Sequence, residues 1–368
     1  MKAFFDYNAT TPLAPEAFTA MRLDLEGPPA NPSSVTAYGR TAKMRLLHAR
    51  ETIAAHLKID PDTIVFTSGA TEANHLLVHG FRKRPGTAVT TAIEHTSLIR
   101  PIERWCPKVH YLATFPDMYF DPDELSRVLQ SKQVSFVALS LANSETGMLL
   151  SCLSEIKSLL YAFDVPLILD CSQALGKMEI DLAGVAGASF SAHKCFGPKG
   201  VGIAVVNPLT PIAPLFQGGH QEGDMRAGTE NVAGILGFAA AVRLIDPAQF
   251  TAIKALRDRF EKSLLEILPD CEIHGGPHRL GNTSSVHFKG IDAEALLIRL
   301  DREGCIISLG SACSAGSLEP SHVLLAAGHS PATARSSLRF SFHRTTTPEE
   351  IDLLLETLSS QTALQKIK

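Results

Sequence analysis

The stretch "ASFSAHKCFGPKGVGIAVVN" (Ala188–Asn207) contains two short β-rich runs joined by a turn that includes Gly197 and Pro198. The first run ends in His193 and Lys194, which places a lysine at the end of an apolar strand. A lysine in this place can be a solvated surface charge or a nucleophile that points into a cleft. The residues that end the other strands of the chain decide between these interpretations.

Four more β-rich runs precede this stretch, at residues 63–68, 87–95, 134–143 and 165–173. Helical stretches lie between the runs. In "DPDELSRVLQS", for example, Asp121 is the expected N-cap and Pro122 the first helical residue. Strands that alternate with helices predict βαβ units and a mainly parallel sheet.

The pattern changes near residue 248, where a long helix leads into short strand-like runs. We therefore expect an α/β protein with two domains. Residues 15–247 would form the large domain, and residues 1–14 and 248–368 a smaller α+β domain.

Composition excludes several classes of protein. The 368 residues are 45% hydrophobic and 20% charged, with a net charge of −4, which is typical of a globular protein that binds neither nucleic acid nor membrane. The longest apolar run, Val232–Val242, is too short to span a bilayer and fits a buried helix. The N-terminus lacks the pattern of a signal peptide, so we expect a cytoplasmic protein.

Cysteines and histidines give no sign of a metal site. The seven cysteines are odd in number and include no CxxC pair, which argues against a disulfide framework or a zinc cluster. His75 and His79 are spaced like helical zinc ligands but lack an HExxH arrangement.

Polar or ionisable residues stand at the end of five predicted strands. Ligands of open parallel sheets bind at the carboxyl ends of the strands, so these residues are expected to form one composite site. In chain order they are Ser68, Gly69, Ala70 and Thr71; Glu94 and His95; Asn143; Asp170 and Gln173; and Ser191, His193 and Lys194.

Each of these residues also has an ordinary structural explanation. The segment "SGATE" (68–72) can be a helix cap or a phosphate cradle at a helix N-terminus. Asp170 follows the apolar run "PLIL", so its carboxylate is expected to be buried beside an arginine or a cationic ligand atom. His95 can be an ordinary hydrogen-bonded histidine. Taken together, however, the cradle, the imidazole, the buried carboxylate and the lysine are typical of a pyridoxal phosphate site.

At this point a family resemblance becomes clear. The sequence closely resembles the cysteine desulfurases, in the class V aminotransferase branch of the fold-type-I pyridoxal phosphate enzymes. The motifs that carry the resemblance span nearly the whole chain: "DYNATTPLAP", "NPSSVTAYGR", "FTSGATEANH", "IEHTSL", "ANSETG", "LDCSQALGK", "SAHKCFGPKGVG", "GGHQEGDMRAGTENV", "GSACSAGSLEPSHVL" and "LRFSFHRTTTPEEID".

The resemblance implies a large domain with a mainly parallel seven-stranded sheet and a small C-terminal domain that carries the cysteine loop. It also implies four catalytic residues. Lys194 matches the lysine that forms the Schiff base, Asp170 the carboxylate at the pyridine nitrogen, His95 the imidazole stacked on the ring, and Cys313 the nucleophile that accepts sulfur.

Further residues match binding positions of the family. Asn143 and Gln173 match groups near the ring hydroxyl. Arg339 matches the arginine that binds the substrate carboxylate, and Asn8 and Asn143 are expected beside the substrate. The expected phosphate ligands are Thr71, Ser191, His193 and, donated by the partner subunit, Thr229. Ala70 is a further expected cofactor-binding residue.

The implied reaction converts L-cysteine to L-alanine and leaves a persulfide on Cys313, for delivery to a sulfur acceptor or a scaffold protein in iron-sulfur cluster assembly. The implied assembly is a homodimer. The small residues of "GSACSAGS" supply little core packing, so Cys313 is not expected to be a buried structural cysteine, whereas Cys305 lies in an apolar run and is expected in the core.

Three alternatives stay open. The chain can be a selenocysteine lyase, another class V aminotransferase, or a sulfur-transfer module without catalysis. The "GSAC" loop argues against an aminotransferase, which needs no thiol, and the presence of Lys194, Asp170 and Arg339 argues against a module.

The sequence also departs from the usual family pattern. The departures are Ser144, Thr146, Cys171 and Cys195, and an end at Lys368 without the longer tail that many members use toward a scaffold.

Overall fold

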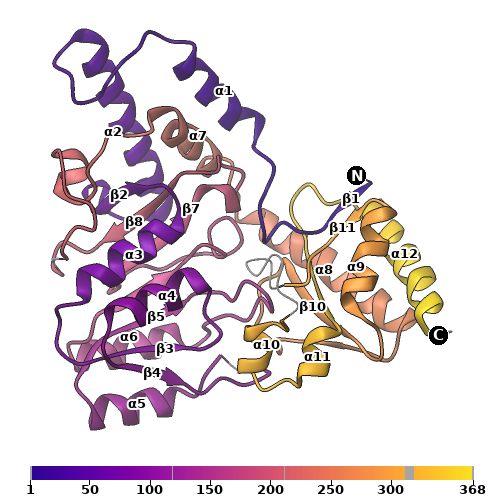
Figure 1. Cartoon of the computed structure of the whole chain (residues 1–368). Coiled ribbons are helices and arrows are strands. Elements are labelled where there is room, and N and C mark those ends of the chain that lie inside the picture. The colour runs from indigo at the N-terminus through magenta and orange to yellow at the C-terminus, as the bar shows by residue number, and fades with distance from the viewer. Residues whose placement is uncertain (1, 118, 211, 311–318, 367–368) are drawn as a thin grey trace.

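The computed structural model describes residues 2–117, 119–210, 212–310 and 319–366. Figure 1 shows two lobes, one built around the strands labelled β2 to β8 and one around β10, with α8, α9 and α12 packed near it. The chain begins at the smaller lobe with β1 (Ala3–Phe4) and then crosses to α1 (Pro15–Leu25) on the larger one. The N-terminal segment therefore passes between the lobes.

The larger lobe holds a seven-stranded sheet in the order β2-β8-β7-β6-β5-β3-β4. The pairs among β3 to β7 are parallel, whereas β8 runs antiparallel to both of its neighbours. The strands are β2 (Ile64–Thr67), β3 (Thr87–Thr91), β4 (Val109–Leu112), β5 (Val134–Ser140), β6 (Leu167–Asp170), β7 (Gly187–Ser191) and β8 (Gly202–Val206).

Helices cover both faces of this sheet because alternate strand residues point to opposite sides. Leu139 and Leu169 pack in one apolar cluster with residues of α2 and α6, whereas Ala138 and Ile168 pack in another with residues of α3 and α4. The helices of this lobe are α1, α2 (Ala37–Leu57), α3 (Ala70–Phe81), α4 (Thr96–Trp105), α5 (Pro122–Ser131), α6 (Leu153–Ala162) and α7 (Val232–Val242).

The smaller lobe contains an antiparallel sheet in the order β12-β10-β9 and a parallel pair, β1 with β11. Its own apolar core includes Phe260, Phe288 and Phe340, and the N-terminal residues Ala3 and Phe5 are buried in it. Its elements are α8 (Ala248–Ile267), β9 (Cys271–Ile273), β10 (Thr283–Phe288), α9 (Ala293–Arg302), β11 (Cys305–Ile306), α10 (His322–Ala326), α11 (Pro331–Arg335), β12 (Ser337–Ser341) and α12 (Pro348–Lys366).

The architecture confirms the predicted fold class, an α/β protein with a mainly parallel seven-stranded sheet. The buried helix Val232–Val242 and the N-cap Asp121, whose Oδ1 accepts from the Asp123 amide at 3.0 Å, also agree with the prediction. The strand β4 was not predicted. The exact division into residues 15–247 and the remainder stays a prediction.

The predicted strands are longer than the observed ones. The strand predicted to end at His95 stops at Thr91, and the one predicted to end at Lys194 stops at Ser191. In both cases the polar residues lie in the connection that follows, where His95 caps α4 and Lys194 ends a short 3₁₀ turn. Within the described part of the chain, the structure offers no helix with the length and apolarity needed to cross a membrane.

Candidate active site

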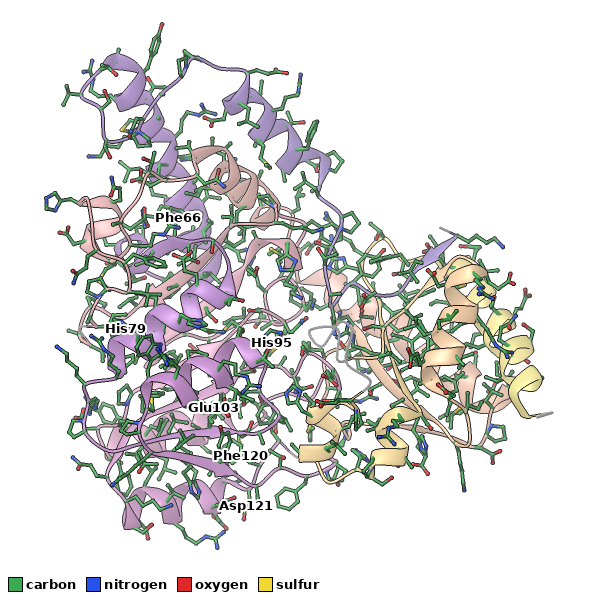
Figure 2. All side chains as sticks on the ribbon, viewed as in Figure 1. Phe66, His79, His95, Glu103, Phe120 and Asp121 are labelled. Atoms are coloured by element: carbon green, nitrogen blue, oxygen red, sulfur yellow. The ribbon has the colours of Figure 1, made fainter. Side chains whose placement is uncertain are left out.

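The carboxyl edge of the parallel strands carries the residues that the sequence singled out. Asp170 and Ser191 are the last residues of β6 and β7, and Asn143 follows β5 after two residues. His95 follows β3, and Figure 2 shows it on the side of the larger lobe that faces the smaller one. The site therefore lies where the two lobes meet.

Lys194 does not behave as a solvated surface charge. Its half-buried side chain directs Nζ to the carbonyl oxygens of Asn8, at 2.6 Å, and Ala9, at 2.8 Å. The N-terminal segment is fixed in turn by two hydrogen bonds, from the Thr11 amide to the His193 carbonyl at 2.9 Å and from the Phe196 amide to the Thr11 hydroxyl at 2.6 Å. The amine is thus held at a defined place by backbone carbonyls.

Asp170 is a buried carboxylate that neutral groups hold in place. Oδ2 accepts from Asn74 Nδ2 at 2.8 Å, and Oδ1 accepts from the Ser172 amide at 2.9 Å and the Ser172 hydroxyl at 2.5 Å. Among the described residues no arginine or lysine forms an ion pair with it. Burying a carboxylate without a cationic partner costs free energy, so a cation is expected to pair with it. Asp170 thus fits a cationic ligand atom.

His95 belongs to the same hydrogen-bond network. Its Nδ1 accepts from the Ser97 amide at 3.1 Å and lies 2.8 Å from the Ser97 hydroxyl. That hydroxyl accepts from Asn74 Nδ2 at 3.1 Å, and Asn74 also binds Asp170. With Nδ1 as an acceptor, a neutral ring carries its proton on Nε2. The network thereby fixes both the imidazole and the carboxylate.

The N-terminus of α3 forms a cradle that fits a phosphate. Gly69, with φ +152°, precedes the helix and leaves it without a side-chain cap. A Cβ on Gly69 would lie 3.6 Å from the Ser191 hydroxyl, and a Cβ on Gly202 would come within 2.6 Å of the Gly69 Cα. The exposed Thr71 lies in the first turn. An uncapped helix start beside two hydroxyl groups is suited to an anion.

His193 lies beside this region as a neutral imidazole. Its Nδ1 is 3.2 Å from the Thr10 hydroxyl. Burial lowers the pKa of His193 to about 4, and the positive charges of Lys194, Lys199 and Lys177 contribute in the same direction. At neutral pH the ring can therefore donate a hydrogen bond without adding a charge.

Two buried amides complete the large-lobe side of the site. Asn143 Nδ2 donates to the Ile93 carbonyl at 2.8 Å, and Oδ1 accepts from the Glu145 and Thr146 amides at 2.9 Å each. Gln173 Nε2 donates to the Asn8 carbonyl at 3.0 Å. Each of the two NH₂ groups has a second hydrogen that can serve a ligand.

The Asn8 side chain hydrogen-bonds to other residues of the protein. Its Nδ2 donates to the Ser144 carbonyl at 3.2 Å and to the Thr283 hydroxyl at 2.9 Å, while Oδ1 accepts from Asn282 Nδ2 at 2.9 Å and Lys177 Nζ at 3.1 Å. In this structure the residue joins the two lobes. Its predicted contact with the substrate stays a prediction.

Arg339, on β12, reaches the site from the smaller lobe. Nη1 donates to the carbonyls of Ser144 and Gly310 at 3.1 and 3.3 Å, and Nη2 donates to Asp6 Oδ1 at 2.6 Å. The buried Nε has no partner among the described residues. The guanidinium is therefore fixed in direction, and its predicted contact with a substrate carboxylate stays a prediction.

Two site residues were not given a role from the sequence. Glu145 is buried, accepts from the Ser321 hydroxyl, and has a raised pKa because burial outweighs the nearby His322 and Arg339. Lys177 is buried beside Gln173 and Asn8. The sequence does contain a signal for Lys177, because this lysine is the charged residue in the otherwise uncharged segment "QALGKM".

The contacts described above do not include two of the predicted site residues, Thr229 and Cys313. Thr229 is exposed on a segment that the Arg226–Glu72 ion pair, at 2.8 Å, holds against the first turn of α3. Its contribution to a partner subunit's site stays a prediction. Cys313 lies outside the described residues.

Known proteins resemble this chain over nearly its whole length. The sequence matches the family model Aminotransferase class-V over residues 3–354. It is 35% identical to the cysteine desulfurase IscS of Dictyoglomus turgidum, over 97% of this chain and 93% of that protein. It is 37% identical to a cysteine desulfurase of Trichormus azollae, over 96% and 91% of the two chains.

Solved structures show the same relationship. A NifS-like protein superimposes with a TM-score of 0.89 at 29% identity, over 99% of this chain and all of that one. A complex of SspA with cysteine superimposes with a TM-score of 0.81 at 28% identity, over 94% of this chain and 100% of that one. Together with the matched family model, these similarities show that the chain belongs to the cysteine desulfurases, within the class V aminotransferase family.

Proposed function

We propose that this protein converts L-cysteine to L-alanine and transfers the sulfur to Cys313, with pyridoxal phosphate as its cofactor. One observation carries the proposal: Lys194, the start of α3 without a side-chain cap, and the Asp170 carboxylate converge on one edge of the sheet, and no described residue forms an ion pair with that carboxylate. The likeness to a protein solved with cysteine supports the choice of substrate.

The residues present fit this cofactor. The start of α3, with Thr71 and Ser191, would hold the phosphate, and Asp170 would pair with the protonated ring nitrogen. His95 would lie against the ring, and Lys194 would bind its aldehyde carbon. When bound, the cofactor supplies a cationic ring that accepts the electron pair released when the substrate loses its Cα proton.

The remaining steps belong to the chain's own side chains. Arg339 binds the substrate carboxylate and fixes the orientation of Cα. Lys194 Nζ would remove the Cα proton, as a general base within reach of the reacting atom. The Cys313 thiolate attacks the substrate sulfur, so that an S–S bond forms as the Cβ–S bond breaks. Protonation of Cβ and return of a proton to Cα give alanine, and the protein retains a persulfide.

Five of the six described cysteines offer little competition as nucleophiles. Burial raises the pKa of Cys106 to about 11 and that of Cys195 to about 12. The pKa values of Cys152, Cys171 and Cys305 are also raised, and burial is again the largest cause. Because the thiolate is the reactive form, these five thiols are poor candidates at neutral pH.

We further propose a homodimer in which Thr229 completes the phosphate site of the neighbouring subunit. Exposed apolar side chains between residues 25 and 44 support this assembly, because burial in an interface would remove them from water. They include Leu25, Val35, Tyr38 and Met44, whose relative exposures are 72%, 87%, 58% and 64%. Sedimentation velocity tests this part, and a fully active monomer would contradict it.

The persulfide would then pass to an acceptor or scaffold protein, in iron-sulfur cluster assembly or another route of sulfur delivery. We place these events in the cytoplasm. All six described cysteines are free thiols, which suits a reducing compartment.

Turnover with L-cysteine tests the activity. Purified protein loaded with pyridoxal phosphate should release alanine, and an added reductant should release one sulfide per alanine. Formation of a keto acid in place of alanine would indicate an aminotransferase. Turnover of L-selenocysteine alone would indicate a selenocysteine lyase.

A further inference from the structure

Lys177 is a buried lysine that the reaction described above does not use. It follows β6 in the segment "LDCSQALGK", and its side chain is 5% exposed. Among the described residues it forms no ion pair with a carboxylate. Burial, and then the charges of Lys194 and Arg339, lower its pKa well below the ordinary value. Burying a lysine without a carboxylate partner costs folding free energy, so a functional role for its contacts is expected.

Those contacts are two amide oxygens. Nζ donates to Gln173 Oε1 at 2.5 Å and to Asn8 Oδ1 at 3.1 Å. Asn8 Oδ1 has a second donor, Asn282 Nδ2 at 2.9 Å. Among the described contacts, the donor to Gln173 Oε1 is Lys177 Nζ. The orientation of Gln173 therefore depends on Lys177 more than that of Asn8 does.

A lysine amine that donates to an amide oxygen fixes which way the amide faces. With Oε1 of Gln173 turned to Lys177, Nε2 must face the opposite way, and it donates to the Asn8 carbonyl at 3.0 Å. The same carbonyl accepts from Lys194 Nζ at 2.6 Å. One backbone oxygen, with its two lone pairs, thus serves both Gln173 and Lys194.

We infer that Lys177 is a positioning residue for the cofactor site. It holds the Gln173 amide with its NH₂ group toward Lys194 and the cofactor. The fixed NH₂ group also keeps the Asn8 carbonyl hydrogen-bonded when Lys194 moves off it to take a proton. The inference rests on the proposed function in one respect, that Lys194 is the lysine that binds pyridoxal phosphate.

The test uses cofactor binding and needs no substrate. Lys177→Met keeps a side chain of similar length and removes the amine. Titration of cofactor-stripped protein with pyridoxal phosphate should give a dissociation constant about tenfold higher than that of the wild type, since a buried amide oxygen has lost its donor. The absorption maximum of the bound cofactor should shift as well. The matched control is Lys157→Met, which removes a lysine paired with Asp181 at 2.8 Å elsewhere on the same lobe, and it should change neither quantity.

A double-mutant cycle shows whether Lys177 acts through Gln173. Adding Lys177→Met to Gln173→Leu should change the dissociation constant by less than about threefold, because contacting residues that act as one unit are not additive. If the two effects multiply, or if Lys177→Met binds the cofactor with the wild-type constant and spectrum, the inference is wrong.

Gln173→Glu gives a second test that does not depend on whether Lys177→Met folds. The carboxylate keeps the acceptor for Lys177 and removes the donor to the Asn8 carbonyl. The variant should stay folded, because Lys177 keeps its acceptor, while cofactor binding weakens about as much as in Gln173→Leu. Wild-type cofactor binding in Gln173→Glu would overturn the inference. None of these measurements uses cysteine, so a protein that bound the cofactor but made no alanine would refute only the proposed function.

Discussion

Arg339 Nη2 and Asp6 Oδ1 form an ion pair with a separation of 2.6 Å, although the two residues are 333 positions apart. The pair joins β12 to the N-terminal segment that passes between the lobes. Two carbonyls hold Nη1 of the same guanidinium, and Nε is left without a partner among the described residues. The structure thus orients this cation before any substrate arrives.

Arg339→Lys should raise the KM for L-cysteine by at least about tenfold and lower kcat less. A lysine amine cannot keep Asp6 and the two carbonyls while also presenting a donor to the substrate carboxylate, and a hydrogen bond to a charged group contributes ~1.5–3 kcal/mol. Steady-state kinetics measures both constants. Asp6→Asn is the control: it breaks the ion pair but keeps the guanidinium, so KM should not rise comparably. An unchanged KM in Arg339→Lys would show that another group binds the carboxylate.

Lys194→Ala should abolish the covalent link to the cofactor. Reduction of the holoenzyme with borohydride, followed by peptide mass analysis, should find the adduct on Lys194 in the wild type and none in the variant. Lys199→Ala removes an exposed lysine five positions away and should retain the adduct. An adduct found on Lys199 or Lys177 in the wild type would contradict the assignment.

Asp170→Asn should bind the cofactor and turn over more than about 100-fold more slowly. The amide cannot stabilise a protonated ring nitrogen, and loss of one partner of a buried charged pair costs roughly 3–5 kcal/mol. Ser172→Ala removes one donor to Asp170 and keeps the charge, so its kcat should fall much less. Comparison of kcat at saturating cofactor and cysteine separates the two cases, and near-normal turnover in Asp170→Asn would make the carboxylate structural.

The sequence predicted the parallel sheet and the site at its edge because both depend on local patterns. Asp170 and Ser191 end β-rich runs, and strand direction brings such ends together. It did not predict β4, a short edge strand. It also could not place Asn8 against Asn282, 274 residues away, or Lys177 against Asn8. Contacts of this kind depend on how the lobes pack, which the periodicity of a segment does not record.

Glu94 should make folding stability fall as the pH rises from about 4.5 to 7. Its carboxyl group is fully buried, and burial raises its pKa to about 7 from 4.5 despite hydrogen bonds from Ser140, Thr91 and Tyr119. In this range the folded state keeps a proton that the unfolded state has lost. The stabilisation that is present below pH 4.5 is therefore lost as the pH rises to about 7. The change is on the order of 3 kcal/mol.

Thermal midpoints of the wild type and Glu94→Gln across pH 4.5 to 8 measure this effect. The difference, wild type minus variant, should decline up to about pH 7 and then level off. Tyr119→Phe removes one hydrogen bond and keeps the buried carboxyl, so it should retain the decline. A difference that does not vary with pH would mean that Glu94 ionises in the folded state as it does in the unfolded chain.

Cys313 should be the residue that accepts the substrate sulfur. Cys313→Ser should keep the bound cofactor and the binding of cysteine, since neither uses this thiol, and it should lose alanine release because no thiolate is left to take the sulfur. Wild-type protein incubated with cysteine should gain one sulfur on the peptide that contains Cys313. Selenocysteine turnover should survive better, because selenium leaves from carbon without the help of a thiol more easily than sulfur does. Cys305→Ser is the matched control, because the Cys305 thiol is buried and its pKa is raised. The role of Cys313 is refuted if the added sulfur maps to Cys171, Cys195 or Cys305, or if Cys313→Ser desulfurates cysteine at the wild-type rate.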